Sequence, residues 1–165
     1  MRSKFYVWFY RLVLNCMPCI WGGGGKVIVL TPDFRRLVVR LRLKIRTMNI
    51  MGTIFGGSMY ASTDPMFMIM LMEILGKDYV VWDKGCTIRF KRPAKKNIFC
   101  EFLITDEMLE KVKSEVASNN ETTFTWTVAY KNKDGVVYCE FDKVLYVATK
   151  SFYEKKLAAR RAKNS

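Results

Sequence analysis

The residues best suited to chemistry lie between positions 49 and 64 of the 165-residue chain. Gly56 and Gly57 stand where an apolar helix is expected to begin, and glycines there allow a ligand to approach the backbone closely. The unpaired N–H groups of a first helical turn favour negative charge, such as the oxyanion that develops on an acyl carbonyl. Asp64 is the sole carboxylate between Gly57 and Glu73, which makes it the candidate base or nucleophile.

The spacing of Gly57 and Asp64 bears on how the two residues could act together. On one helix they would lie on a similar face but roughly 10 Å apart along the axis, which is too far for both to touch one carbonyl group. Two such helices running antiparallel across a dimer axis would bring Gly57 of one chain near Asp64 of the other. The alternative is a structural role, in which Asp64 accepts a hydrogen bond from Tyr60 or caps a kink at Pro65.

The composition excludes several kinds of active site. The chain has no histidine, so Ser-His-Asp and Cys-His mechanisms, His-ligated metals and an imidazole base are all excluded. Its five cysteines are odd in number and scattered, which is typical of reduced thiols in the cytoplasm, and no metal site is predicted. The length suits one domain that can bury a substantial core.

The central apolar segment requires an architecture that surrounds it. From about residue 54 to residue 75 the chain is apolar on nearly every side, so we expect a long helix buried by other structure. Strands are predicted at 27–30, 37–46, 86–91, 98–105, 124–131 and 136–149, with a helix at 106–117 and a hairpin turn at 132–135. This pattern predicts an α+β fold in which a curled antiparallel sheet wraps around one long helix.

Both ends of the chain differ from this central region. Residues 1–25 predict an N-terminal amphipathic helix followed by a glycine hinge at 22–25, and residues 151–165 predict a basic C-terminal tail. The apolar stretch at 5–21 contains Arg11 and is too short and too polar for a membrane-spanning helix. We expect it to pack on the domain, and the alternative is that it lies on a membrane surface.

The net charge of +13 is concentrated in three basic blocks. Residues 2–46 hold ten Lys and Arg against one acid, residues 89–97 hold five without an acid, and residues 150–165 hold six against one. Such blocks can attract nucleic acid, anionic lipid or a phosphate-bearing cofactor, and the alternative is a solvated face of alternating strand residues. No nucleic-acid-binding module is recognisable, so specific nucleic-acid binding is not predicted.

The motif around the glycine pair is similar to that of a known family. Asn49-x-x-Gly52-x-x-x-Gly56-Gly57, followed by Asp64, resembles the signature of hotdog-fold acyl-CoA thioesterases of the phenylacetyl-CoA type. The fuller strings at 52–58, 64–65, 79–84 and 88–93 resemble a thioesterase-like hotdog family still labelled a domain of unknown function. The resemblance implies a hotdog fold for residues 26–150, to which the N-terminal helix is an addition.

The resemblance also implies roles for individual residues. Gly57 would donate its N–H to the thioester carbonyl, Asn49 would position water or substrate, and Asp64 of the partner subunit would activate water or attack directly. The residues that would contact substrate beside these are Thr53, Phe55, Gly56 and Ser58. Many relatives carry histidine where this chain has Phe55, so a polar contact found in those relatives is missing here.

Two functions are expected from these features. The first is an acyl-CoA hydrolase that works as a homodimer or a pair of dimers, in the cytoplasm and without a cofactor besides the coenzyme A of its substrate. In it, Arg89, Lys91 and Arg92 would hold the phosphates of coenzyme A. The second is a non-catalytic acyl- or lipid-binding hotdog protein with peripheral membrane contact, for which the methionine-rich helix would provide an adaptable apolar lining.

Overall fold

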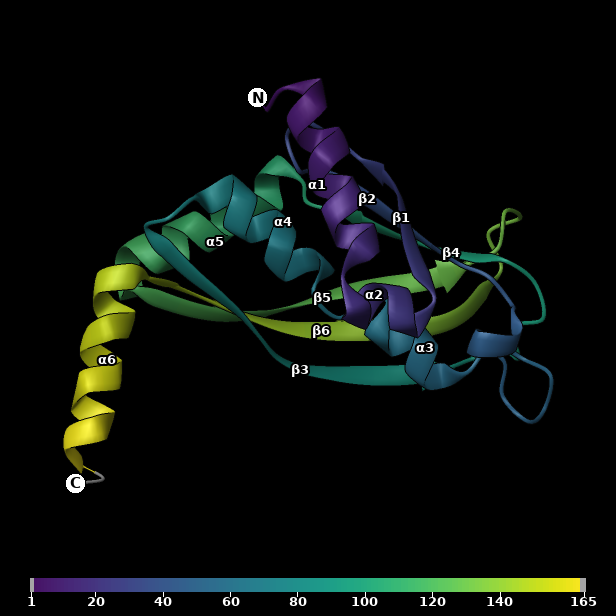
Figure 1. The fold of residues 1–165 in the computed structure, drawn as a ribbon. Coiled ribbons are helices and arrows are strands. Elements are labelled where there is room, and N and C mark those ends of the chain that lie inside the picture. Colours follow the sequence, from purple (N-terminus) through teal and green to yellow (C-terminus); the bar gives the residue numbers. More distant parts are fainter. Residues whose placement is uncertain (1, 164–165) are drawn as a thin grey trace.

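The fold is built on an antiparallel sheet that curves around two central helices (Figure 1). The computed structural model describes residues 2–163. The strands are β1 Gly25–Leu30, β2 Arg36–Leu41, β3 Tyr79–Phe90, β4 Ile98–Leu103, β5 Glu121–Lys131 and β6 Val137–Thr149. Their order across the sheet is β1-β2-β4-β5-β6-β3, so β1 and β3 form its two edges. The predicted α+β class and curled antiparallel sheet are confirmed.

The central helix segment is buried by the sheet, as its all-round apolar pattern predicted. The helices in the described residues are α1 Lys4–Cys16, α2 Pro18–Gly23, α3 Gly56–Ala61, α4 Met66–Leu75, α5 Asp106–Asn119 and α6 Lys150–Lys163, with a short 3₁₀ turn, η1, at Ile45–Thr47. Phe67 of α4 meets Phe102 of β4 and Trp126 of β5 edge-on, with ring centroids 4.9 and 5.0 Å apart. These contacts fix α4 against the concave face of the sheet.

The prediction of one continuous helix from 54 to 75 is wrong, because the helix is broken at residues 62–65. Pro65 has no N–H, and its ring would clash with the carbonyl of Ala61 if the helix continued through it. The hydroxyl of Ser62 donates to the carbonyl of Ser58 at 2.6 Å, in addition to the 3.2 Å bond from the Ser62 N–H, and the two bonds close the end of α3. Asp64 therefore lies in a turn between two helices.

Two strands differ in length from their predictions. β2 stops at Leu41, although the alternation continues to Arg46, because the first residue of β1 and the first residue of β4 both pair with Leu41. Beyond that point neither neighbouring strand continues, and the chain turns into η1. β3 begins at Tyr79, well before the predicted Cys86, because the last residue of the long strand β6 pairs with Tyr79.

The N-terminal helices pack along the β1 edge of the sheet. Val7, Leu14 and Ile20 are buried in the same hydrophobic core as the sheet residues. The glycines at 22–25, predicted as a hinge, close α2 and begin β1, with Gly24 at a φ of 82°. A Cβ on Gly25 would overlap Ser62, so close backbone packing against the end of α3 explains that glycine.

The C-terminal helix α6 projects away from the sheet (Figure 1) and buries none of its residues. The predicted basic tail is therefore helical over most of its length. Its last turn carries Arg160, Arg161 and Lys163, where positive charge is favoured by the helix dipole. Across residues 2–163, no helix has both the length and the apolar character needed to cross a bilayer.

Candidate active site

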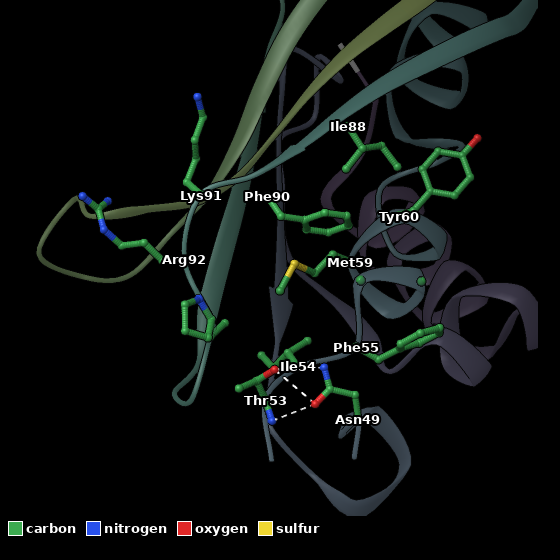
Figure 2. Close-up of a pocket in the computed structure, with 14 residues that line it drawn as sticks. Asn49, Thr53, Ile54, Phe55, Met59, Tyr60, Ile88, Phe90, Lys91 and Arg92 are labelled. Atoms are coloured by element: carbon green, nitrogen blue, oxygen red, sulfur yellow. Dashed lines mark hydrogen bonds between the residues drawn. The ribbon is translucent and has the colours of Figure 1, made fainter. Parts of the chain in front are cut away.

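An open cleft of about 730 Å³ lies at the N-terminus of α3, beside the edge strand β3 (Figure 2). Met59, Ile88 and Phe90 form part of its apolar wall. The residues predicted from the sequence that line it are Asn49, Thr53, Phe55, Gly56, Gly57, Lys91 and Arg92. Ser58, Asp64 and Arg89 do not line it within one chain. The fold thus gathers most of the predicted site in one place.

Backbone N–H groups at the start of α3 face no acceptor of their own helix. The first bond of the helical ladder runs from the N–H of Met59 to the carbonyl of Phe55 at 3.2 Å. The preceding N–H groups, those of Gly56, Gly57 and Ser58, come before the ladder begins, and the Phe55 side chain does not cap them. An anion or a polarised carbonyl oxygen is the natural partner for such a turn.

Two aromatic rings explain the glycine pair. A Cβ on Gly56 would lie 2.6 Å from the ring of Phe90, and a Cβ on Gly57 would overlap the ring of Phe55. Both rings are more than half exposed, so each lies over the helix terminus outside the core. Glycine at both positions lets these rings approach the backbone closely.

Asn49 organises the loop that leads into α3. Its side-chain carbonyl accepts hydrogen bonds from the N–H groups of Met51 and Thr53, at 3.0 and 3.1 Å. Its Nδ2 donates to the Thr53 hydroxyl at 2.9 Å, and Figure 2 shows the two side chains joined at the base of the cleft. Most of the hydrogen-bonding capacity of this amide is therefore used to hold the loop. A role for Asn49 in positioning water or substrate stays a prediction.

The predicted phosphate-binding residues are engaged in contacts on the sheet. Arg89 binds Asp142 through two hydrogen bonds of 2.6 and 3.0 Å, which lowers the pKa of Asp142 to about 2. Lys91 forms a 3.1 Å ion pair with Glu140, and Arg92 donates to a backbone carbonyl of β6. Lys91 and Arg92 line the cleft. Arg89 is paired with Asp142 of β6 and does not line it.

Asp64 is half-exposed in the turn between α3 and α4 and contacts a buried lysine. Its Oδ1 lies 3.0 Å from Nζ of Lys143, whose side chain is 1% exposed. The same Nζ lies 3.5 Å from Oδ1 of Asp83 on β3 and 5.2 Å from the ring centre of Tyr60. The Asp64 carboxylate beside the Tyr60 hydroxyl raises the pKa of Tyr60 to about 12. The structural alternative for Asp64, contact with Tyr60 at a kink before Pro65, is therefore present.

Lys143 is a residue that the sequence reasoning missed. Alternation along β6 places it on the same face as Cys139, Phe141 and Leu145, all of which are fully buried. A lysine at an inward position of a buried strand needs carboxylate partners. The inward position of Lys143 in the β6 pattern was therefore the signal that could have identified it. Its second partner is Asp83, where burial outweighs the attraction of Lys143 and raises the pKa to about 6.

Cys86 is partly buried and Cys139 is buried. All five cysteines are free, and burial raises the pKa of Cys139 to about 12, which keeps that thiol protonated. Burial also raises the pKa of Cys86, the cysteine of β3. Among the described residues, no cluster of three or more cysteine, aspartate or glutamate side chains could hold a metal ion.

Several solved structures with the same fold are of proteins called thioesterases or probable thioesterases. A protein of unknown function from Pseudomonas aeruginosa, called a probable thioesterase, matches with a TM-score of 0.76 and 17% identity over 90% of this chain and 98% of its own. A thioesterase from Haemophilus influenzae gives 0.64 and 12% over 90% and 94%. Mouse thioesterase superfamily member 2 gives 0.61 and 17% over 88% and 98%. These likenesses establish the hotdog fold.

Sequence comparison gives the family. No curated protein matches this chain. The model of a family described as a domain of unknown function, DUF4442, matches residues 7–147. That span includes most of α1, the whole cleft, Asp64 and Lys143. The chain is therefore a hotdog-fold member of the DUF4442 family.

Proposed function

We propose that this protein hydrolyses acyl thioesters, with acyl-CoA as the preferred class, in a dimer whose two sites each use both chains. The observation that carries the proposal is the cleft at the start of α3, which combines uncapped backbone N–H groups with an apolar wall. A thioester presents the matching pair of features, a carbonyl oxygen that becomes negative during attack and an apolar acyl chain. The thioesterase neighbours agree with this class of substrate.

In the proposed reaction, Gly57 donates its N–H to the thioester oxygen. Asp64 of the partner subunit takes a proton from water as the water oxygen attacks the carbonyl carbon. The carbon–sulfur bond of the resulting tetrahedral species then breaks, and the thiolate of coenzyme A leaves and is protonated. Loss of one oxyanion donor of this kind typically lowers the rate by about 10²–10³.

The requirement for a dimer rests on where Asp64 lies. It does not line the cleft of its own chain, so one chain supplies the oxyanion donors without the carboxylate. The strand next to the cleft, β3, is 12 residues long and forms an edge of the sheet. A long uncovered edge strand is a template for pairing with a second copy. Antiparallel pairing there would bring Asp64 of the partner subunit toward Gly57.

The apolar wall of the cleft bears on which acyl group the protein would bind. Met59 offers an adaptable thioether chain, and Phe90 and Phe55 are half-exposed rings that an acyl group could displace or stack on. Lys91 and Arg92 at the rim are the remaining candidates for the phosphates of coenzyme A. An aromatic or medium-length acyl chain would cover these rings best.

The test is hydrolysis of a panel of short, long and aromatic acyl-CoAs, measured as release of the free thiol of coenzyme A. We expect turnover of at least one member and a loss of about 10²-fold or more in Asp64→Asn. Asp83→Asn is the matched control, because it also removes a carboxylate from Lys143 but leaves Asp64 in place. Absence of turnover, or equal losses in the two variants, would refute the catalytic role of Asp64.

A second candidate function is non-catalytic binding of an acyl group or lipid. It is favoured by two contacts: Asp64 is already paired with Lys143, and the Phe55 ring covers Gly57. The same panel separates the candidates, because a binder would give a calorimetric binding signal with an acyl-CoA without releasing thiol. Peripheral membrane contact is compatible with either function and depends on a different surface.

A further inference from the structure

The N-terminal helices carry an apolar face that points into solvent. α1 buries one side against the sheet, through Val7 and Leu14, and leaves its opposite side uncovered. The residues of this apolar face, each between 44% and 72% exposed, are Phe5, Trp8, Phe9, Leu12, Val13 and Trp21. Soluble monomers rarely expose so many large apolar side chains in one place without a partner.

A pocket without any acidic residue lies next to this face. It measures about 260 Å³ and its charged residues are Lys26, Arg40, Arg42, Lys44 and Arg46. None of the five forms an ion pair with another described residue. Cations that are gathered this closely without counter-ions repel one another, so the pocket is suited to an anion that neutralises them.

Arg40 is the clearest sign of a missing anion. Its Nε is buried and has no hydrogen-bond partner among residues 2–163. Burial and the neighbouring Arg42 lower the pKa of Arg40 below its ordinary value, as expected for a guanidinium that lacks a counter-ion. A buried guanidinium N–H normally finds an acceptor, and phosphate oxygens fit the guanidinium geometry well.

The apolar face and the basic pocket form one continuous surface. A groove on the outer side of β1 is lined by Trp8 and Leu12 from the apolar face and by Lys26 and Arg40 from the basic pocket. At the other end, the guanidinium of Arg46 stacks on the ring of Trp21 at 4.4 Å. Exposed aromatic side chains beside unpaired cations are the combination that binds a lipid headgroup region.

We propose that this surface docks onto an anionic phospholipid bilayer, with the apolar face in the headgroup–acyl boundary and a lipid phosphate in the basic pocket. Charge complementarity favours the bilayer over a protein partner, because the segment 2–46 carries ten cations and one acid. Leu12 and Val13 favour a bilayer over nucleic acid, because aliphatic side chains offer no stacking surface for bases. The proposal does not depend on thioester hydrolysis.

The experiment is flotation of the full-length protein with vesicles of phosphatidylcholine alone or mixed with phosphatidylglycerol. We expect flotation only with the anionic vesicles, together with a blue shift of tryptophan emission from Trp8 and Trp21. The double variant Arg42→Gln/Arg46→Gln should bind on the order of thirtyfold more weakly, since each basic residue near an anionic surface contributes about fivefold. Phe9→Ser should also weaken flotation without changing the melting temperature by more than a few degrees.

Matched controls separate this surface from general electrostatics. Lys111→Gln/Lys133→Gln removes the same charge from exposed positions elsewhere, and Leu103→Ser changes a side chain that is 51% exposed against 52% for Phe9. Both controls should float like the wild type. Equal weakening in the controls, or absence of flotation, would overturn the proposal. So would a pocket that binds inorganic phosphate or DNA through Arg42 and Arg46 while vesicles stay unbound.

Discussion

The two edge strands of the sheet differ in whether their outer side is covered. The β1 edge is closed by α1: Asn15 accepts a hydrogen bond from the N–H of Val27 at 2.7 Å and donates to its carbonyl at 3.0 Å. Arg11 adds a bond to the carbonyl of Ile28. The β3 edge is twice as long as β1, at 12 residues against 6, and no strand of the described chain pairs with its outer side.

The difference indicates which edge is available for pairing with another strand. Side chains that satisfy the backbone of an edge strand prevent a second strand from adding to it, and the β1 edge has them. The β3 edge lacks them and lies beside the cleft that contains the α3 N-terminus. The chain thus protects the edge far from the cleft and leaves the edge near it available, which is the arrangement a shared active site requires.

We expect the greatest loss of stability at the β3 edge, where Lys143 of β6 contacts Asp83 of β3 and Asp64 of the turn between α3 and α4. Lys143→Met leaves the carboxylates of Asp64 and Asp83 without their shared cation. We expect the free energy of unfolding to fall by about 3–5 kcal/mol, as measured by urea denaturation. Lys131→Met, an exposed lysine of β5, is the control and should stay within about 0.5 kcal/mol of wild type. Similar losses in both variants would contradict a special role for Lys143.

At the closed edge, Asn15→Leu removes both side-chain bonds to Val27. The unsatisfied N–H and carbonyl should lower the free energy of unfolding by about 2–3 kcal/mol and promote self-association through β1. Asn15→Asp keeps the acceptor for the Val27 N–H and should cost less. Unfolding curves and sedimentation at several concentrations give both quantities. If Asn15→Leu stays monodisperse with unchanged stability, α1 does not protect that edge.

The third effect on stability depends on pH. Burial raises the pKa of Asp83 to about 6, so between about pH 4 and pH 6 the folded chain binds more protons than the unfolded chain at this group. Its contribution to the free energy of unfolding therefore falls as pH rises through that window, by up to about 3 kcal/mol. Asp83→Asn should remove this slope, measured as the difference in urea midpoints between wild type and variant at each pH. Parallel curves for the two proteins would show that Asp83 has an ordinary pKa.

Much of the fold could be predicted because its signals are local. The turn at 132–135 and the helix at 106–117 follow from residue type and periodicity, and the structure contains both. The early end of β2 could not be predicted, because its alternation continues and only the lengths of the neighbouring strands stop it. Strand ends of this kind are set by tertiary pairing.

In the candidate site, too, local features could be predicted from the sequence and contacts between distant residues could not. Gly56, Gly57 and Thr53 lie on one continuous segment, so sequence spacing alone placed them together in the cleft. The apolar pattern predicts a continuous helix through Asp64, although Pro65 favours the break that the structure shows. The ion pairs of Arg89 and the contact of Lys143 with Asp64 join positions that are distant in sequence, and no local pattern specifies such partners.

Mixed dimers test whether each site combines Gly57 of one chain with Asp64 of the partner subunit. Gly57→Val, which blocks the oxyanion donor beside Phe55, and Asp64→Asn should each abolish hydrolysis. Co-expression should restore about a quarter of the wild-type rate, since half of random dimers are mixed and each has one intact site. Mixed dimers as inactive as their parents would contradict the shared site.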